Sequence, residues 1–309
     1  MTLCPSTLTV YILSDLRWVT VGINDIEDIK QIPEQADIFW EKLQLDRKHK
    51  ELILNFIVAH ETESTLNGKG TKQNIDDFTT GKGKGLVILL YGLPGVGKTL
   101  TAESLAILLC KPFLSLTASD MSLNGQIVEE KLQSFLSLAK RWGAILLLDD
   151  GDDFLQARGG NDQQRGGFVS DLFRMLEYYD GILILTTTRM KTFDIAVQSR
   201  IHFAIEYRDL SEEQQSSIFR SFIDQLNDKN LVEYLKEIHE WIERGPFDFN
   251  GRQIRNTVLT AIGLAQNQDA ERPKLQCQDL AAVANETMKF QENLKAQEMK
   301  YRAQQIDRP

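Results

Sequence analysis

The sequence has 309 residues, of which 42% are hydrophobic and 26% are charged. This is ordinary for a soluble globular protein with one large unit and one or two smaller ones. The formal net charge of −9 argues against a surface dominated by nucleic acid or anionic membrane contacts, because neutralising phosphate needs clustered Lys and Arg. The three cysteines are far apart and lack metal-ligand spacing, so we expect neither a disulfide framework nor a zinc site.

No stretch approaches the roughly 20 apolar residues that a membrane span requires, so we expect no transmembrane segment. The N-terminus has apolar residues but no basic leader, which favours the cytoplasm or the nucleus. Strand-like residues begin almost at Met1. One interpretation is that the chain is the C-terminal part of a larger architecture, whose first portion would have carried any targeting signal.

Residues 1–79 are interpreted as a small α+β extension and a linker. Alternating apolar residues at 8–13 and 17–21 predict strands, and residues 37–58 have helical apolar spacing. From Glu61 to Lys84 the composition is polar and rich in Gly, which is typical of a linker. We therefore expect a domain boundary near residue 80.

Residues 80–208 are predicted to form the large subdomain of an α/β protein. Apolar runs separated by helical segments indicate buried parallel strands in a doubly wound, five-stranded sheet, at 86–90, 113–116, 145–148, 182–185 and 201–205. From Ser211 onward only helical periodicity is found. It predicts a helical lid over 209–285 and a polar helical tail over 286–309.

A Walker A pattern follows the first of these strands and precedes a helical run. Gly95 and Gly97 would let backbone N–H groups surround phosphate oxygens, Lys98 would contact the β and γ phosphates of ATP, and Thr99 would bind Mg²⁺. The alternative is a Gly-rich turn with an incidental Lys. The predicted nucleotide contacts are Gly92, Pro94, Gly95, Val96, Gly97, Lys98, Thr99 and Leu100.

An acidic run follows the strand at 145–148, about 50 residues after the glycine-rich loop. This is how a Walker B strand delivers a carboxylate to Mg²⁺, and Asp149 is the predicted metal-side acid. Asp150 lies where a general base or water-positioning acid would be, whereas Asp152 and Asp153 are interpreted as solvated loop charges. The alternative for the run is a cluster that caps a helix N-terminus.

These motifs resemble those of AAA+ ATPases, and most closely filamentous-fungal AAA-domain P-loop NTPases. The similarity runs from about Arg17 to Gln266 and includes "AKRWGAILLLDD", "FLQAR", "LEYYDGILILTTTR", "TFDIAVQSRIHFAIEY" and "NGRQIRN". The resemblance implies sensor 1 at Thr188, an arginine finger for a neighbouring subunit at Arg200, and sensor 2 at Arg252. For either arginine, the alternative is a surface or ion-paired side chain.

The sequence departs from the family at three places. Walker B usually ends in Asp-Glu, but Asp150 is one methylene shorter, and sensor 1 is usually Asn rather than Thr188. Because a displacement of about 1 Å can cost roughly 100-fold in rate, we expect slow turnover, unless neighbouring carboxylates such as Asp152 compensate. The expected pore loop lacks an aromatic residue and offers only Met121, Leu123 and Ile127, which puts threading in doubt.

Two functions remain open on these grounds. One is an Mg²⁺-dependent ATPase that assembles into a homo-oligomeric ring, such as a hexamer, and remodels a protein client. The other is a nucleotide-gated scaffold that binds ATP with little hydrolysis. A metabolic kinase fits the P-loop but not the helical lid or the pair Arg200 and Arg252.

Overall fold

The computed structural model describes residues 6–13, 17–26, 38–67, 85–117, 125–152, 175–176, 178–189, 199–245, 247–268 and 274–306. The chain divides into two compact units. The first, which we call the sheet unit, comprises Met1–Leu93 and Gly97–Tyr207. The second, the helical unit, comprises Pro94–Val96 and Arg208–Pro309. The bounds of the four segments expected from the sequence stay predictions.

The sheet unit is built on five parallel strands, as the sequence predicts. They are β3 (Leu86–Gly92), β4 (Phe113–Thr117), β5 (Ile145–Asp149), β6 (Ile182–Thr187) and β7 (Phe203–Tyr207). Their order in the sheet is β4-β5-β6-β3-β7, and every neighbouring pair is parallel. The carboxyl ends of β3, β5 and β6 therefore meet at the same edge of the sheet. The predicted Walker A loop begins there, after β3, and the predicted Walker B strand, β5, ends there.

Helices cover the sheet, which explains why its central strands β3, β5 and β6 are almost continuously apolar. The helices are α3 (Lys98–Leu108) and α4 (Gly125–Trp142). Leu132 and Leu136 of α4 pack in one buried cluster with Leu114 of β4 and Leu146 of β5. Burial of each such leucine contributes about 1.5–3 kcal/mol, so this layer of side chains holds the strand ends in place.

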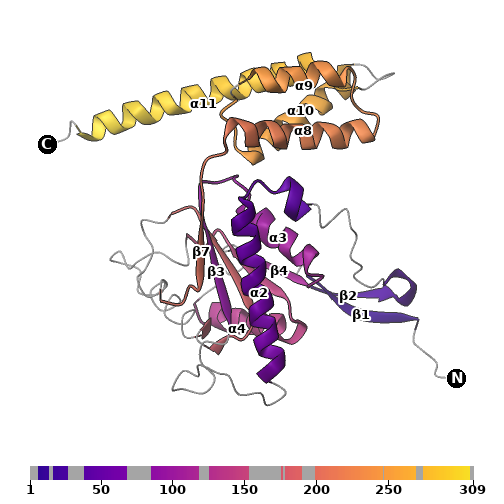
Figure 1. Ribbon diagram of the computed structural model, residues 1–309, viewed down its shortest axis with the longest axis vertical. Coiled ribbons are helices and arrows are strands. Elements are labelled where there is room, and N and C mark those ends of the chain that lie inside the picture. The colour runs from indigo at the N-terminus through magenta and orange to yellow at the C-terminus, as the bar shows by residue number, and fades with distance from the viewer. Residues whose placement is uncertain are drawn as a thin grey trace. The chain divides into compact units, whose positions relative to one another are not determined.

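The N-terminal extension combines a hairpin with a long helix (Figure 1). Strands β1 (Thr7–Ile12) and β2 (Arg17–Gly22) pair antiparallel and lead into a 3-10 turn, η1 (Ile23–Asp25). A π-helical turn, η2 (Ile38–Lys42), precedes α2 (Arg47–Asn67). Because α2 extends to Asn67, the first seven residues of the predicted linker are helical, and 68–84 lie outside the described residues.

The helical unit contains α8 (Glu212–Asp228), α9 (Leu235–Arg244), α10 (Gly251–Gln268) and α11 (Cys277–Ile306). Its core includes a group of mutually packed rings: Phe219, Trp241, Phe247 and Phe249. Within this unit α11 projects well beyond the other helices (Figure 1) and is continuous across residue 285, where we expected the lid to end. No helix among the described residues is both long and apolar enough to cross a membrane.

Candidate nucleotide-binding site

The loop after β3 has a backbone shape that glycine alone adopts without strain. Gly92 and Gly97 have φ angles of +139° and +102°. A Cβ atom at Gly92 would also overlap the carbonyl oxygen of Tyr207 on the neighbouring strand β7. Substitution at either position would therefore cost conformational energy, and at Gly92 it would also push β3 away from β7.

Lys98 begins α3 and is buried, with 6% of its surface exposed. Its Nζ atom donates to the carbonyl oxygens of Gly92, at 2.8 Å, and of Leu93, at 2.7 Å. Gly97 is the N-cap of α3, and no side chain accepts a hydrogen bond there. The first-turn N–H groups and the positive end of the helix dipole are thus left for an anion, and the ammonium lies beside them.

The middle of the loop, Pro94–Val96, groups with the helical unit. The carbonyl oxygen of Gly95 accepts a 2.8 Å hydrogen bond from the N–H of Gly251. A Cβ atom at Gly95 would lie 2.6 Å from Oδ1 of Asn250, and the φ angle of +77° also requires glycine. The side chain of Val96 is buried, whereas those of Pro94 and Leu100 are exposed.

Thr99 and Asp149 lie together at the edge of the sheet. The Thr99 hydroxyl is 3.0 Å from each carboxylate oxygen of Asp149. Thr186 at the end of β6 donates to the same carboxylate at 2.5 Å. A hydroxyl beside a carboxylate is an all-oxygen donor set, which suits Mg²⁺ when it is shared with phosphate and water. Their role as metal ligands stays a prediction.

Asp150 follows directly and is exposed. Its φ angle is +49°, in the left-handed region that Asp tolerates better than most residues. The Asp150 N–H donates to the Thr186 hydroxyl at 2.9 Å. Thr186 therefore connects Asp149, the predicted metal-side acid, to the backbone of Asp150, the predicted water-positioning acid.

Asp152 differs from its interpretation as a solvated loop charge. Its Oδ1 atom accepts hydrogen bonds from the Thr187 hydroxyl and from the N–H groups of Thr188 (3.0 Å) and Arg189 (3.1 Å). Its Oδ2 atom accepts a 2.5 Å hydrogen bond from the Thr188 hydroxyl. The structure thus brings the Walker B segment and the predicted sensor 1 together through Asp152.

The two predicted arginines lie in different units. Arg200 is half-exposed in the turn before β7, with its Nη1 atom 3.4 Å from the Ser199 hydroxyl. Arg252 is exposed in the first turn of α10, whose N-terminus carries a capping box formed by Asn250 and Gln253. The roles assigned to both arginines stay predictions.

Of the expected pore-loop residues, Met121 and Leu123 and the side chain of Ile127 lie outside the described part of the chain.

Comparison with known protein families gives two adjoining matches. Residues 88–209 match the model of the ATPase family associated with various cellular activities (AAA). Residues 210–301 match that of the fungal AAA+ ATPase lid domain. This chain belongs to the AAA+ ATPase family. The AAA match spans the Walker motifs and the predicted sensor 1 and arginine finger, and the lid match begins just before α8.

Curated AAA+ proteins are also similar to this chain. The human ATPase family AAA domain-containing protein 3A is 25% identical over 191 residues, which cover 60% of this chain and 32% of that protein. The human protein 3B is 30% identical over 201 residues (62% and 30%), and protein 3 of Xenopus tropicalis is 29% identical over 228 residues (72% and 35%). This AAA+ chain therefore spans about a third of the length of these relatives.

Sequence reasoning missed Thr186, and it named Asp152 only as a neighbouring carboxylate that could compensate for Asp150. The parallel register of the strands would have predicted the position of Thr186, because Leu148 of β5 pairs with Leu185 of β6. The next residues along the two strands, Asp149 and Thr186, must then emerge side by side. Asp152 follows the end of β5, so its partners depend on a turn that strand register does not predict.

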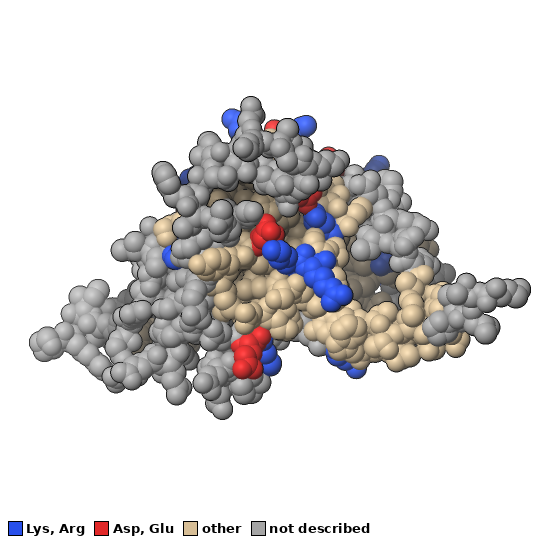
Figure 2. All heavy atoms as spheres, turned by 90° about the horizontal axis from the view of Figure 1, so that it is seen from below, with Lys and Arg blue, Asp and Glu red and all other residues tan. Residues whose placement is uncertain are grey.

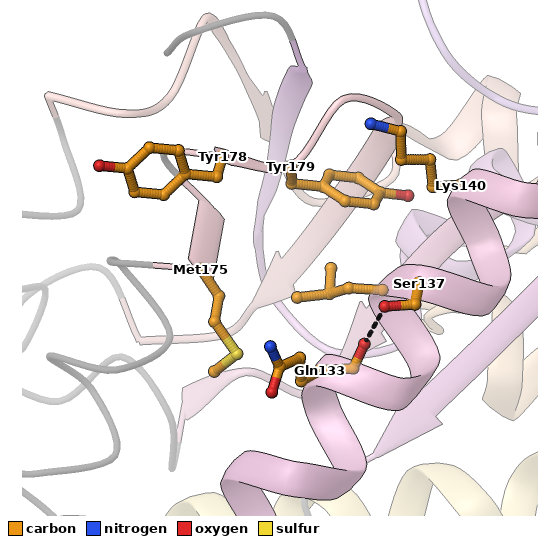
Figure 3. Close-up of a pocket in the computed structure, with 7 residues that line it drawn as sticks. Gln133, Ser137, Lys140, Met175, Tyr178 and Tyr179 are labelled. Carbon is orange, nitrogen blue, oxygen red and sulfur yellow. Dashed lines mark hydrogen bonds between the residues drawn. The ribbon is translucent and has the colours of Figure 1, made fainter. Parts of the chain in front are cut away.

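A cavity lies near the amino ends of β5 and β6, away from the loop after β3. Its volume is about 400 Å³, and it is lined by Gln133, Leu136, Ser137, Lys140, Met175, Tyr178 and Tyr179 (Figure 3). Tyr179 is 4% exposed, and its hydroxyl has no hydrogen-bond partner among the described residues. Burial, followed by the negative charge of Asp180, raises the pKa of Tyr179, so the hydroxyl stays protonated.

Ion pairs join charged side chains near the amino ends of the strands. Lys140 pairs with Asp180 at 3.1 Å, and Lys111 pairs with Glu61 at 2.6 Å. In the view from below, Lys and Arg side chains lie next to acidic ones on a described surface that is otherwise mostly uncharged (Figure 2). The described part of that face therefore shows no broad basic surface of the kind that phosphate backbones require.

Proposed function

We propose that this chain binds Mg²⁺-ATP at the loop after β3 and hydrolyses it to ADP and phosphate. The observation that carries the proposal is the joint placement of the buried Lys98 and the Thr99–Asp149 pair at the uncapped N-terminus of α3. Membership of the AAA+ family supports it. A glycine-rich turn with an incidental lysine would not explain a hydroxyl and carboxylate at the same point.

Each side chain has a distinct task in this proposal. Lys98 would exchange its contacts with two carbonyl oxygens for phosphate oxygens, which the backbone N–H groups of the loop also bind. Thr99 and Asp149 would hold Mg²⁺, which when bound supplies charge neutralisation at the phosphates. Asp150 and Thr188 would hold the attacking water, with Asp150 as its proton acceptor.

We infer a reduced turnover from the side chains at the water position. Asp150 is shorter than the usual Glu, and Thr188 is shorter than the usual Asn. Both departures affect the same water, and positioning errors of about 1 Å can cost roughly 100-fold in rate. Nucleotide binding itself does not depend on either side chain.

A homo-oligomeric ring that remodels a protein client, in the cytoplasm or the nucleus, completes the proposal. Its support is Arg200, which as an arginine finger would act on ATP bound by a neighbouring subunit. The relatives' names describe AAA domain-containing ATPases and add no client.

A second candidate is a scaffold that ATP switches without appreciable hydrolysis, which the exposed and short Asp150 favours. ATP would then stabilise one conformation by binding it preferentially. Steady-state phosphate release beside nucleotide binding separates the two functions. Turnover that is lost in Lys98→Ala but kept in the control Lys236→Ala, an exposed lysine on α9, supports hydrolysis, whereas tight binding without turnover supports the scaffold.

A further inference from the structure

Among the described residues, the hydrogen bonds to the Asp152 carboxylate come from the end of β6 and the two residues that follow it. The donors are the hydroxyl of Thr187, the N–H and hydroxyl of Thr188, and the N–H of Arg189. Partial burial alone would raise the pKa of Asp152, but these four hydrogen bonds hold it below its ordinary value. The group is therefore an anion at neutral pH and can only accept hydrogen bonds.

The direction of each hydrogen bond follows from this charge. Backbone N–H groups donate only, so Oδ1 must accept from Thr188 and Arg189. Oδ2 faces the Thr188 hydroxyl at 2.5 Å, a distance typical of a hydroxyl that donates to an anion. The Thr188 proton is thus committed to Asp152, and the oxygen of Thr188 can offer only lone pairs to any further neighbour.

We propose that Asp152 is a positioning residue that makes the Thr188 hydroxyl an obligatory hydrogen-bond acceptor for the attacking water. In this arrangement Thr188 presents an oxygen acceptor, as the amide oxygen of an Asn would, and the adjacent anion strengthens it. The inference rests on the proposed ATP hydrolysis and deepens it. This arrangement also makes the loss of turnover caused by Thr188 smaller, so that most of the inferred reduction in turnover comes from Asp150.

The isosteric variant Asp152→Asn tests whether the proton of the Thr188 hydroxyl must point toward residue 152. Because two backbone N–H groups require an oxygen at the Oδ1 position, the amide nitrogen must face Thr188 and donate to it. The Thr188 proton is then turned outward, toward the water. We expect kcat to fall by roughly 10- to 100-fold with unchanged ATP affinity, because only the orientation of a reacting group changes.

Companion variants separate this role from a purely structural one. Thr188→Val should lose as much kcat as Asp152→Asn, the double variant should lose no more than either, and Thr188→Ser should retain activity. Thr187→Val removes a hydroxyl from Oδ1 but none from the water, so its kcat should change less than about 3-fold. Urea unfolding of the same variants gives a measurement that needs no nucleotide. The changes in the free energy of unfolding caused by Asp152→Asn and Thr188→Val should be non-additive in the double variant.

The outcomes distinguish the inference from the proposed function. Wild-type kcat in Asp152→Asn, losses that multiply in the double variant, or additive effects on unfolding would each overturn the role of Asp152 alone. Absence of Lys98-dependent phosphate release in the wild type would overturn the proposed hydrolysis, and the role of Asp152 with it.

Discussion

Threonine hydroxyls at the carboxyl end of β6 donate to carboxylates at and just beyond the carboxyl end of β5. Thr186 donates to Asp149, and Thr187 and Thr188 both donate to Asp152. The run of three threonines therefore orients the carboxylates of Asp149 and Asp152. Asp150 is the exception, because its carboxylate is exposed and its backbone N–H makes the contact with Thr186.

Replacing Asp150 with Glu should raise turnover. The longer side chain moves the carboxylate toward the water, and we expect kcat to increase by about 10-fold or more. Because position 150 has a positive φ, which Glu tolerates less well than Asp, the free energy of unfolding should fall by about 1 kcal/mol. Phosphate release and urea unfolding check the two effects, with Asp180→Glu as the control, and unchanged turnover would refute the inferred slowing.

Removing the hydroxyl of Tyr179 should stabilise the protein. This buried hydroxyl lacks a partner among the described residues, so the Tyr179→Phe variant loses a desolvation cost without losing a hydrogen bond. We expect the free energy of unfolding to rise by about 1 kcal/mol. Tyr234→Phe, at an exposed position, should leave it nearly unchanged, and destabilisation by Tyr179→Phe would mean that the hydroxyl has a polar partner.

At the scale of elements, the parallel strands were predictable because burial on both faces requires continuous apolar runs. The start of β7 differs, since we expected it at Ile201 and it begins at Phe203. The Nδ1 atom of His202 accepts the N–H of Val87 at 3.1 Å, a side-chain contact that apolar periodicity does not report. The polar end of α2 was likewise taken for linker, although the Thr62 hydroxyl bonds to the carbonyl oxygen of Val58 inside the helix.

The start of α8 can be tested at its N-cap residue, Ser211. The Ser211 hydroxyl accepts the N–H of Gln214, whose side chain accepts the Ser211 N–H in return. Ser211→Ala should lower the free energy of unfolding by about 1 kcal/mol. Ser216→Ala inside the same helix should change it by less than about 0.5 kcal/mol, since Ala has the better helix propensity, and equal effects would show that the capping box contributes nothing.

At the scale of the whole molecule, the proposed role of Arg200 as an arginine finger requires a second copy of the chain. We expect Arg200→Ala to bind ATP normally and to lose most of its turnover, since such residues contribute about 10³- to 10⁵-fold. Mixing the Arg200→Ala and Lys98→Ala variants should restore part of the activity. The first variant supplies an intact nucleotide site, and a neighbouring subunit of the second supplies an intact Arg200. Normal turnover by Arg200→Ala, or no recovery on mixing at assembling concentrations, would contradict the ring.

The most direct test of ATP hydrolysis is steady-state phosphate release from Mg²⁺-ATP by the full chain, with nucleotide binding measured in parallel. The buried Lys98 and the Thr99–Asp149 pair predict tight binding and slow turnover, both lost in Lys98→Ala and both kept in Lys236→Ala. Phosphate release that persists in Lys98→Ala, or the absence of release despite tight binding by the wild type, would contradict hydrolysis at this loop.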